Sequence, residues 1–346
     1  MLLGLNALAH LLTDAVCASA LFGVVKGSAV ELSWALIIYN TAAFTTQCLV
    51  GLGTDRLRRH ERLAALGLAV CAAAALLPLP GYLLALVIGL GNSLFHVAGG
   101  TVTLKGARDA GPLGVFVAPG AVGLALGTLW PGLRGALCAA ALVTAAALVF
   151  AGRGEPELQF QEGRKDTPWG AVLLLTLAVA FRAVGGCAVE FPWKTGAGMA
   201  MLAAAFVFAG KTLGGFACRR LSAPRPASGD NAPQAPVLGA ARTALWSIPL
   251  AAALTAFCFT WAAPSLAGQL LLNLSMPVTL WLIYRAMPDS PGFAFGLAAS
   301  ALWPGSIAGE MISLTGAWRA LLVIASFAAG LAAIVYAERK ISEVQV

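Results

Sequence analysis

The sequence is divided into a succession of apolar runs, most of them close to twenty residues long, separated by charged residues or by Pro and Gly. A helix of about twenty apolar residues, rising about 1.5 Å per residue, crosses the ~30 Å hydrocarbon core of a bilayer. Backbone polar groups inside a bilayer must bond within their own helix, so these runs predict an all-α integral membrane protein. We predict twelve transmembrane helices, at residues 3–25, 33–53, 62–79, 81–103, 112–130, 134–151, 169–191, 198–217, 241–261, 264–286, 292–313 and 317–337.

The small number of charged residues supports this interpretation. Only 11% of the 346 residues are charged, and 59% are apolar, whereas a soluble domain averages about 25% charged residues. Most of the surface must therefore face lipid. Twelve spans need roughly 250 residues, so we expect short connections with no separate soluble domain among them.

The net charge of +7 does not indicate a nucleic-acid partner, because the basic residues lie in the short connections, as orientation signals do. The seven cysteines stand singly inside apolar segments, and no pair has the spacing of metal ligands. We therefore interpret them as small core residues, and the sequence predicts neither a metal site nor a cofactor.

The distribution of Lys and Arg predicts the orientation. With the N-terminus inside, sixteen basic residues fall on the inner side and four on the outer side, and Arg182 and Lys211 lie within spans. Cytoplasmic loops carry such an excess, so we expect a multi-pass protein of the cell (inner) membrane with both termini cytoplasmic. The inner set is Arg56, Arg58, Arg59, Arg62, Lys105, Arg108, Arg153, Arg164, Lys165, Arg219, Arg220, Arg225, Arg242, Arg285, Arg339 and Lys340, and the outer set is Lys26, Arg134, Lys194 and Arg319.

The spans are expected to form two pseudo-symmetric halves of six helices. Residues 152–168 are polar and divide the chain into an N-terminal bundle at 1–151 and a C-terminal bundle at 169–346, with a second, flexible cytoplasmic loop at 222–240. The segment 109–112 (DAGP) before the fifth span is echoed by 289–292 (DSPG) before the eleventh. Many transporters are built from such repeats, with the binding site between them.

Residues 51–59 (GLGTDRLRR) resemble the signature of the major facilitator superfamily between its second and third helices, although the usual Gly before the last basic pair is absent. The resemblance implies a gating latch, in which Asp55 forms ion pairs with Arg56, Arg58 and Arg59 in one conformational state. The other interpretation is an orientation signal with an incidental Asp. Cys218 stands where the C-terminal half would have its Asp, so a second latch is not expected.

Two further segments resemble the fosmidomycin-resistance-like branch of that superfamily. Residues 10–14 (HLLTD) match its His-x-x-Asn-Asp stretch except at Thr13, and residues 92–96 (NSLFH) match its Ser-x-Phe-His, without the Pro-Glu that commonly follows. The fifth span carries Gly114, Gly123 and Gly127 at the spacing of the antiporter signature, with Thr128 in place of its Pro. This resemblance implies a transporter and favours export.

Ionisable residues at bilayer depth are costly and mark a pathway by default. His10 and Asp14 are one helical turn apart on the first span, and Asn6 continues the same face. We expect this stripe to line a central cavity or, alternatively, only to fix helix packing. Arg182 on the seventh span needs an anionic partner, which could be Asp14, Glu190 or the substrate.

The remaining intramembrane polar residues form a longer set of candidates. His96 is either a proton carrier or a hydrogen-bonded core residue, and Lys211 is expected to extend towards the membrane interface. We assign proton coupling to Asp14, His10, His96, Glu190 and Glu310. We assign substrate binding to Arg182, Asn92, Tyr39, Asn40, Gln269, Asn273 and Trp303.

Together these features predict a secondary active transporter, a symporter or antiporter, moving a small polar or anionic solute by alternating access, with H⁺ as the coupling ion. A drug or metabolite exporter and an uncoupled facilitator remain alternatives, and a membrane receptor or a membrane enzyme is a more remote one. The sequence shows no nucleophile–base set, no zinc-protease motif and no phosphate-binding loop, so an enzyme is not expected. The expected partners are the solute and the lipid bilayer, and the protein is expected to be a monomer.

Overall fold

The computed structural model describes residues 1–27, 31–105, 107, 109–152, 167–222 and 239–345. Within these ranges the chain is helical, and nearly all of the predicted linker at 152–168 and of the predicted loop at 222–240 lies outside them. Apolar runs that alternate with turn residues favour helices that end in short polar or Pro/Gly-containing connections. The prediction of an all-α fold is confirmed.

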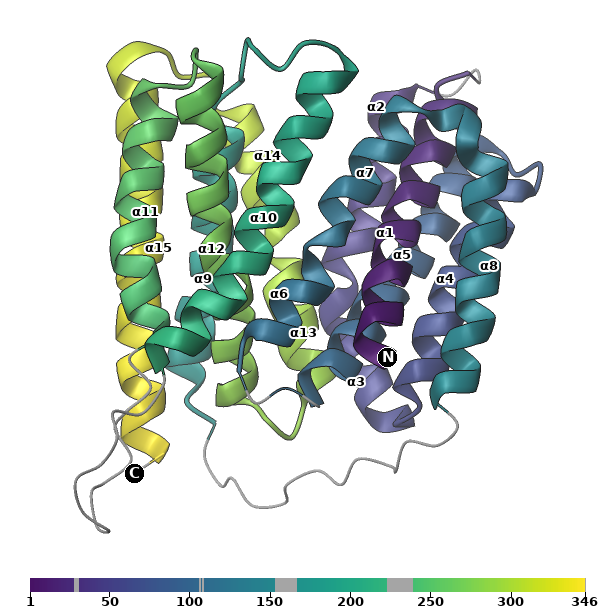
Figure 1. The fold of residues 1–346 in the computed structure, drawn as a ribbon, viewed down its shortest axis with the longest axis horizontal. Helices are drawn as coiled ribbons and strands as arrows, with labels where there is room; N and C mark the ends of the chain where they lie inside the picture. Colours follow the sequence, from purple (N-terminus) through teal and green to yellow (C-terminus); the bar gives the residue numbers. More distant parts are fainter. Residues whose placement is uncertain (28–30, 106, 108, 153–166, 223–238, 346) are drawn as a thin grey trace.

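The first half of the chain forms a bundle of six rods, seen on the right in Figure 1. Four of the rods are broken or continued by a second helical segment. In order, the rods are α1 (Leu2–Ala20) with its π-helical extension η1 (Leu21–Val25); α2 (Leu32–Asn40), η2 (Thr41–Thr45) and α3 (Gln47–Leu57); α4 (His60–Leu76); α5 (Gly81–Lys105); α6 (Gly111–Val117) and α7 (Pro119–Leu129); and η3 (Pro131–Leu133) with α8 (Arg134–Ala151).

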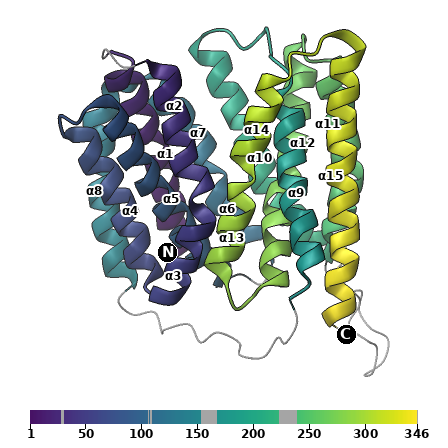
Figure 2. The ribbon, with the colours of Figure 1, turned by 180° about the vertical axis from the view of Figure 1, so that it is seen from behind.

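The second half forms another bundle of six rods beside the first (Figure 2). These are α9 (Trp169–Cys187), α10 (Gly196–Ser222), α11 (Gly239–Phe257), α12 (Ala262–Ala286), α13 (Pro291–Ser300) with α14 (Leu302–Met311), and α15 (Gly316–Gln345). Each predicted apolar run coincides with one rod. Among the described residues, eight helices are by themselves long and apolar enough to cross a membrane, or nine if the bent pair of Leu32–Thr45 and Gln47–Leu57 is one span.

Three rods are interrupted near their middle. The second rod bends by 42° where the π-helical turn η2 meets α3, and π-helical turns inside helices are frequent at functional sites. The fifth rod is divided at Pro119, whose ring cannot continue the hydrogen-bond ladder of α6. The eleventh rod is divided at Ala301, between α13 and α14. Interrupted helices of this kind line cavities in many transporters.

The two halves repeat one pattern of helix packing. In the first half, the first rod contacts the fifth and sixth (α1 with α7 and α8), and the third contacts the fourth (α4 with α5). In the second half, α9 contacts α14 and α15, and α11 contacts α12, which are the equivalent pairs. The internal repeat predicted from short sequence echoes is therefore present in the packing.

The halves meet near the end of the molecule where the C-terminus lies (Figure 1). Here α3 packs on α13, and α10 packs on α6, so each half contributes its second and fifth rods. Glycines permit the close approach: a Cβ atom on Gly51 would collide with the backbone of Gly292, and one on Gly114 would lie 2.7 Å from the carbonyl oxygen of Lys211. Small residues at such contacts are typical of membrane helices.

Candidate functional site

A cavity of about 600 Å³ lies between the two halves. One wall comes from α1, α5, α6 and α7 with Phe44 and Gln47 of the second rod, and the other comes from α9, α10, α12, α13 and the start of α14. Lys194, an exposed residue of the connection between α9 and α10, also lines it, so the cavity reaches the surface at the end away from the C-terminus. A cavity of this size accommodates a small molecule.

The N-terminal wall carries a cluster of His10, Asp14 and His96. His10 and Asp14 are four residues apart on α1, which places both side chains on the face turned to the cavity, and α5 brings His96 against them. His10 Nε2 lies 3.4 Å from Asp14 Oδ2, and His96 Nε2 lies 3.7 Å from Asp14 Oδ1. The side chains are only 6% (His10), 19% (Asp14) and 12% (His96) exposed, so little water competes for these contacts.

Backbone carbonyl groups fix the tautomers of both imidazoles. His10 Nδ1 lies 2.7 Å from the carbonyl oxygen of Phe116, and His96 Nδ1 lies 2.9 Å from that of Asn92. A carbonyl oxygen only accepts, so each Nδ1 carries a hydrogen, and in a neutral ring Nε2 is then an acceptor. The two Nε2 atoms are 2.8 Å apart. This geometry suits a cation between them, either a shared proton or a metal ion.

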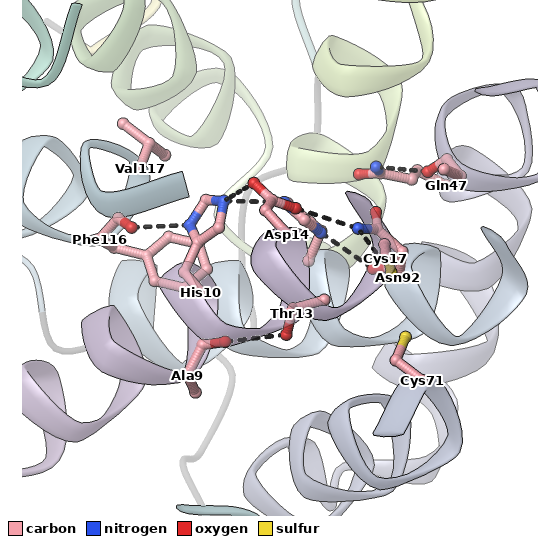
Figure 3. A network of polar contacts seen from close by, with 12 residues as sticks. Ala9, His10, Thr13, Asp14, Cys17, Gln47, Cys71, Asn92, Phe116 and Val117 are labelled. Atoms are coloured by element: carbon pink, nitrogen blue, oxygen red, sulfur yellow. Dashed lines mark hydrogen bonds and ion pairs between the residues drawn. The ribbon is translucent and has the colours of Figure 1, made fainter. Parts of the chain in front are cut away.

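The amide of Asn92 completes the surroundings of Asp14. Its Nδ2 donates to Asp14 Oδ1 at 3.1 Å, and Figure 3 shows His10, Asp14 and Asn92 joined in one network. Asn6, by contrast, is buried and donates to the Gly99 carbonyl and to Thr103 Oγ1. The predicted stripe therefore divides: His10 and Asp14 face the cavity, whereas Asn6 joins α1 to α5.

Two cations occupy the C-terminal wall. The Arg182 guanidinium on α9 donates to Ser275 Oγ at 3.2 Å, and Lys211 Nζ on α10 donates to the Val117 carbonyl at 3.3 Å. Among the described residues, no carboxylate forms an ion pair with either cation. The expectation that Lys211 extends to the membrane interface is wrong, because its side chain lines the cavity. An Arg182–Asp14 pair and an Arg182–Glu190 pair are likewise not formed.

Two amides on α12 also line this wall, as the sequence analysis proposed. Gln269 and Asn273 are one helical turn apart, and Asn273 Nδ2 donates to the Gln269 carbonyl at 2.8 Å. The oxygen of the Asn273 side chain therefore remains an acceptor facing the cavity region. Amides beside cations add directional hydrogen bonds to a site that otherwise attracts any anion.

Several candidates from the sequence do not line the cavity. Tyr39 is packed in the core of the first half, and Asn92 lies behind Asp14 rather than on the cavity surface. Asn40 is also absent from the cavity wall. Glu190 and Glu310 are exposed beyond the cavity, so the structure does not bring them to the His–Asp cluster.

Trp303 connects the halves instead of lining the cavity. Its Nε1 donates to Thr41 Oγ1 at 3.1 Å, across the boundary between α14 and η2. Ser300 contacts the same rod: it accepts from the Cys48 backbone N–H at 3.1 Å and donates to the Phe44 carbonyl at 3.1 Å. These contacts hold the interrupted second and eleventh rods together.

Asp55 is a charged residue that joins the halves at the end where they are packed. Its Oδ1 and Oδ2 accept from the backbone N–H groups of Gly292 and Phe293, at 2.8 and 2.9 Å, so it caps the N-terminus of α13. Arg56, Arg58 and Arg59 are exposed. Asp55 thus bonds to backbone amides of the opposite half, where the helix dipole also favours a carboxylate, and the ion-pair latch with the arginines stays a prediction.

Residues that the sequence analysis did not single out also shape the site. Phe295 on α13 lines the cavity, and Gly120 sits over the cluster so closely that a Cβ atom there would collide with His10 and Asp14. Neither residue has a sequence signal, because apolar aromatics and glycines are common in membrane helices. Only the packing of α7 on α1 reveals the role of Gly120.

Comparison with known proteins places the fold. No protein-family model and no curated protein sequence matches the chain. Solved structures do match: the outward conformation of FucP, a major facilitator superfamily transporter, has a TM-score of 0.65 at 13% identity and covers 96% of this chain and 97% of that chain. A variant of the E. coli fucose:proton symporter FucP gives 0.61 at 13% identity, with the same coverage.

A third solved structure has the same architecture. A bacterial homologue of the iron transporter ferroportin, in the outward-facing state, matches with a TM-score of 0.61 at 12% identity over 100% of this chain and 99% of that chain. The chain therefore has the twelve-helix major facilitator fold, as predicted. The resemblance to the fosmidomycin-resistance-like branch stays a prediction, because these identities bear on the fold alone.

Proposed function

We propose that this chain is a secondary active transporter that moves a small anionic or polar solute across a membrane by alternating access, coupled to protons. The observation that carries the proposal is the cavity between the halves, with the His10–Asp14–His96 cluster on one wall and Arg182 and Lys211 on the other. Ligand sites between the halves are typical of transporters built from repeats.

The charges of the wall favour an anionic solute. Arg182, Lys194 and Lys211 are the positively charged lining residues, and Asp14 is the acidic one. A buried cation without a carboxylate partner is costly, and a solute carboxylate or phosphate would relieve that cost. The planar guanidinium of Arg182 can bind such a group through two parallel hydrogen bonds, while Lys211 supplies a point charge.

The His–Asp cluster supplies the proposed proton site. A proton between His10 Nε2 and His96 Nε2 makes one ring an imidazolium, next to the Asp14 carboxylate. Loss of this proton leaves two acceptors facing each other, so the cluster must rearrange. Its position on the cavity wall lets the rearrangement alter the surface that the solute meets. FucP, which shares the fold, is named as a proton symporter.

Alternation requires the packed end to open. Asp55 and the glycine contacts between α3 and α13 hold this end closed while the cavity reaches the surface at the other end. Release of the Asp55 cap would let the two bundles rotate about the cavity and expose it on the opposite side. Both termini lie in the cytoplasm under this proposal, the protein is a monomer, and the membrane is the inner one.

Export by antiport, as the branch resemblance favours, and uncoupled facilitation differ from this proposal in measurable ways. The purified protein is reconstituted in liposomes, which are screened with organic anions. A transported anion is expected to accumulate inside the liposomes when a pH gradient is imposed. Asp14→Asn should abolish that accumulation and spare solute exchange without a gradient. Equal accumulation with and without the gradient would identify a facilitator, and absence of movement with any solute that binds would favour a receptor. Chemical conversion of a bound solute would indicate an enzyme.

A further inference from the structure

We propose that the His10–Asp14–His96 cluster is also a binding site for a divalent transition-metal ion, open to the cavity. One ligand atom from each of the three residues, an imidazole nitrogen of each histidine and a carboxylate oxygen of Asp14, lie within 4.8 Å of one another. The inference goes beyond the proposed function and does not rest on it, because it concerns binding of the ion and not its transport. Binding itself can be measured independently.

The distances fit a metal of the first transition row. Ligand atoms about 2.0–2.1 Å from a tetrahedral ion are separated by about 3.3–3.4 Å. The separation of His10 Nε2 from Asp14 Oδ2, 3.4 Å, matches this value, and His96 Nε2 lies slightly farther, 3.7 Å, from the other oxygen, Oδ1. The Nε2 atoms, 2.8 Å apart, need to separate by about half an ångström. His96 can supply this movement because its ring is partly exposed to the cavity.

The surroundings of the rings are those of metal-ligating histidines. Each Nδ1 is tied to a backbone carbonyl, at Phe116 and at Asn92, which leaves both Nε2 lone pairs directed to the same space. This second hydrogen bond orients a ligating ring and raises its basicity. The side chain of Asn92 similarly holds Asp14 by donating to Oδ1. The geometry thus directs two imidazole nitrogens and a carboxylate oxygen to the same space.

The ligand set indicates which ion binds and how. Two imidazoles and one carboxylate favour Zn²⁺, Fe²⁺ or Co²⁺ over Mg²⁺ and Ca²⁺, which prefer oxygen ligands. Structural zinc sites are closed by four protein ligands, whereas three ligands leave a position for an exchangeable group. Here that position faces the cavity. The site therefore suits an ion that enters from the cavity and exchanges with it.

Binding of Co²⁺ to the purified full-length protein, prepared without a polyhistidine tag, tests the inference. The wild type is expected to bind one ion and develop the visible d–d absorption of a tetrahedral site, displaced by Zn²⁺ and not by Mg²⁺. His96→Ala and Asp14→Asn should each weaken binding at least tenfold. His60→Gln is the matched control, because His60 is a buried histidine at the start of α4, outside the cavity, and it should bind like the wild type.

Two results would overturn the metal site. One is a wild type that does not bind Co²⁺ or Zn²⁺ in a one-to-one ratio, and the other is equal affinity in the wild type and a folded His96→Ala variant. Thermal unfolding and gel filtration establish that the variants are folded, and the partly exposed position of His96 makes its truncation the milder change. If no metal binds while Asp14→Asn still loses proton-driven accumulation, the metal inference fails and the proposed function stands. If metal binds and no solute moves, the metal inference stands and the proposed function fails.

Discussion

His10 and His96 face each other through their Nε2 atoms at 2.8 Å, although 86 residues separate them in the chain. Each ring is held from behind by a backbone carbonyl, so neither can turn its protonated nitrogen to the other without losing a buried hydrogen bond. The pair therefore suits a cation, whose charge the Asp14 carboxylate beside it would balance.

The first prediction concerns the anion-binding wall. Arg182→Ala should weaken binding of an anionic solute roughly tenfold or more, because one charged hydrogen bond is worth about 1.5–3 kcal/mol. Arg182→Lys should lose much of the same affinity, since an ammonium lacks the planar pair of donors. Isothermal titration of the purified variants measures both. Arg319→Lys is the matched control, because Arg319 stacks on Phe259 away from the cavity.

The same variants test whether Arg182 stabilises the fold. Its contact in the described structure is the Ser275 hydroxyl, without a carboxylate partner, so Arg182→Ala should unfold at the same temperature as the wild type or higher. The effects of Arg182→Ala and Asp14→Asn on stability should be additive. Recovery of lost stability in the double variant would instead show that the two residues pair with each other.

The second prediction concerns the cap that Asp55 places on α13. Asp55→Ala removes the acceptor for two backbone N–H groups and should destabilise the closed end by about 0.5–2 kcal/mol. Asp55→Asn keeps one acceptor oxygen and should be intermediate. Spin-label distances between α3 and α13 should shift towards the open state, and the transport rate should change more than protein abundance.

Arg56→Gln separates this cap from the ion-pair latch expected from the sequence. Arg56 is exposed at the end of α3, next to Asp55. If backbone capping holds the halves together, Arg56→Gln should leave the distance distribution unchanged. A shift as large as that of Asp55→Ala would restore the ion-pair explanation.

The sequence predicted most of the fold because bilayer thickness imposes one length on every span. It also predicted the His10–Asp14 pair, since residues four apart share a helix face. It could not place His96 against them, because the depth of a residue in the bilayer does not determine the direction in which its side chain points around the helix axis. For the same reason, the sequence did not predict that Asn6 bonds to α5 or that Tyr39 and Asn40 lie away from the cavity.

The contacts of Lys211 and Asp55 that the sequence did not reveal have a different origin. A lysine near a helix end usually extends to water, but α6 lies across that path and offers the Val117 carbonyl instead. Asp55 bonds to backbone amides, and these are present at every residue, so no side-chain pattern could have identified α13 as its partner. Both contacts depend on how the two halves dock, which the individual spans do not encode.

The third prediction concerns orientation in the membrane. A cysteine placed at exposed Gly132, in the connection before α8, should react with a membrane-impermeant maleimide added to intact cells. A cysteine at exposed Arg339, near the end of α15, should react only after the cells are permeabilised. The expectation rests on the sixteen-to-four distribution of basic residues. The parent protein, with its own seven cysteines, sets the background, and the opposite labelling pattern would reverse the proposed direction of opening.

The last prediction uses two glycines on one helix as a matched pair. A Cβ atom on Gly51 would collide with the backbone of Gly292 and Phe293 in the opposite half, whereas one on Gly53 meets no atom within 4 Å. Gly51→Ala should therefore separate α3 from α13 and favour the state open at the packed end, with slower transport. Gly53→Ala should keep the wild-type distances and add about 0.5–1 kcal/mol of helix stability. Cysteine cross-linking across α3 and α13 measures the populations. Equal cross-linking in both variants would show that this contact does not control the closed state, because the two substitutions differ only in the neighbour that the methyl group meets.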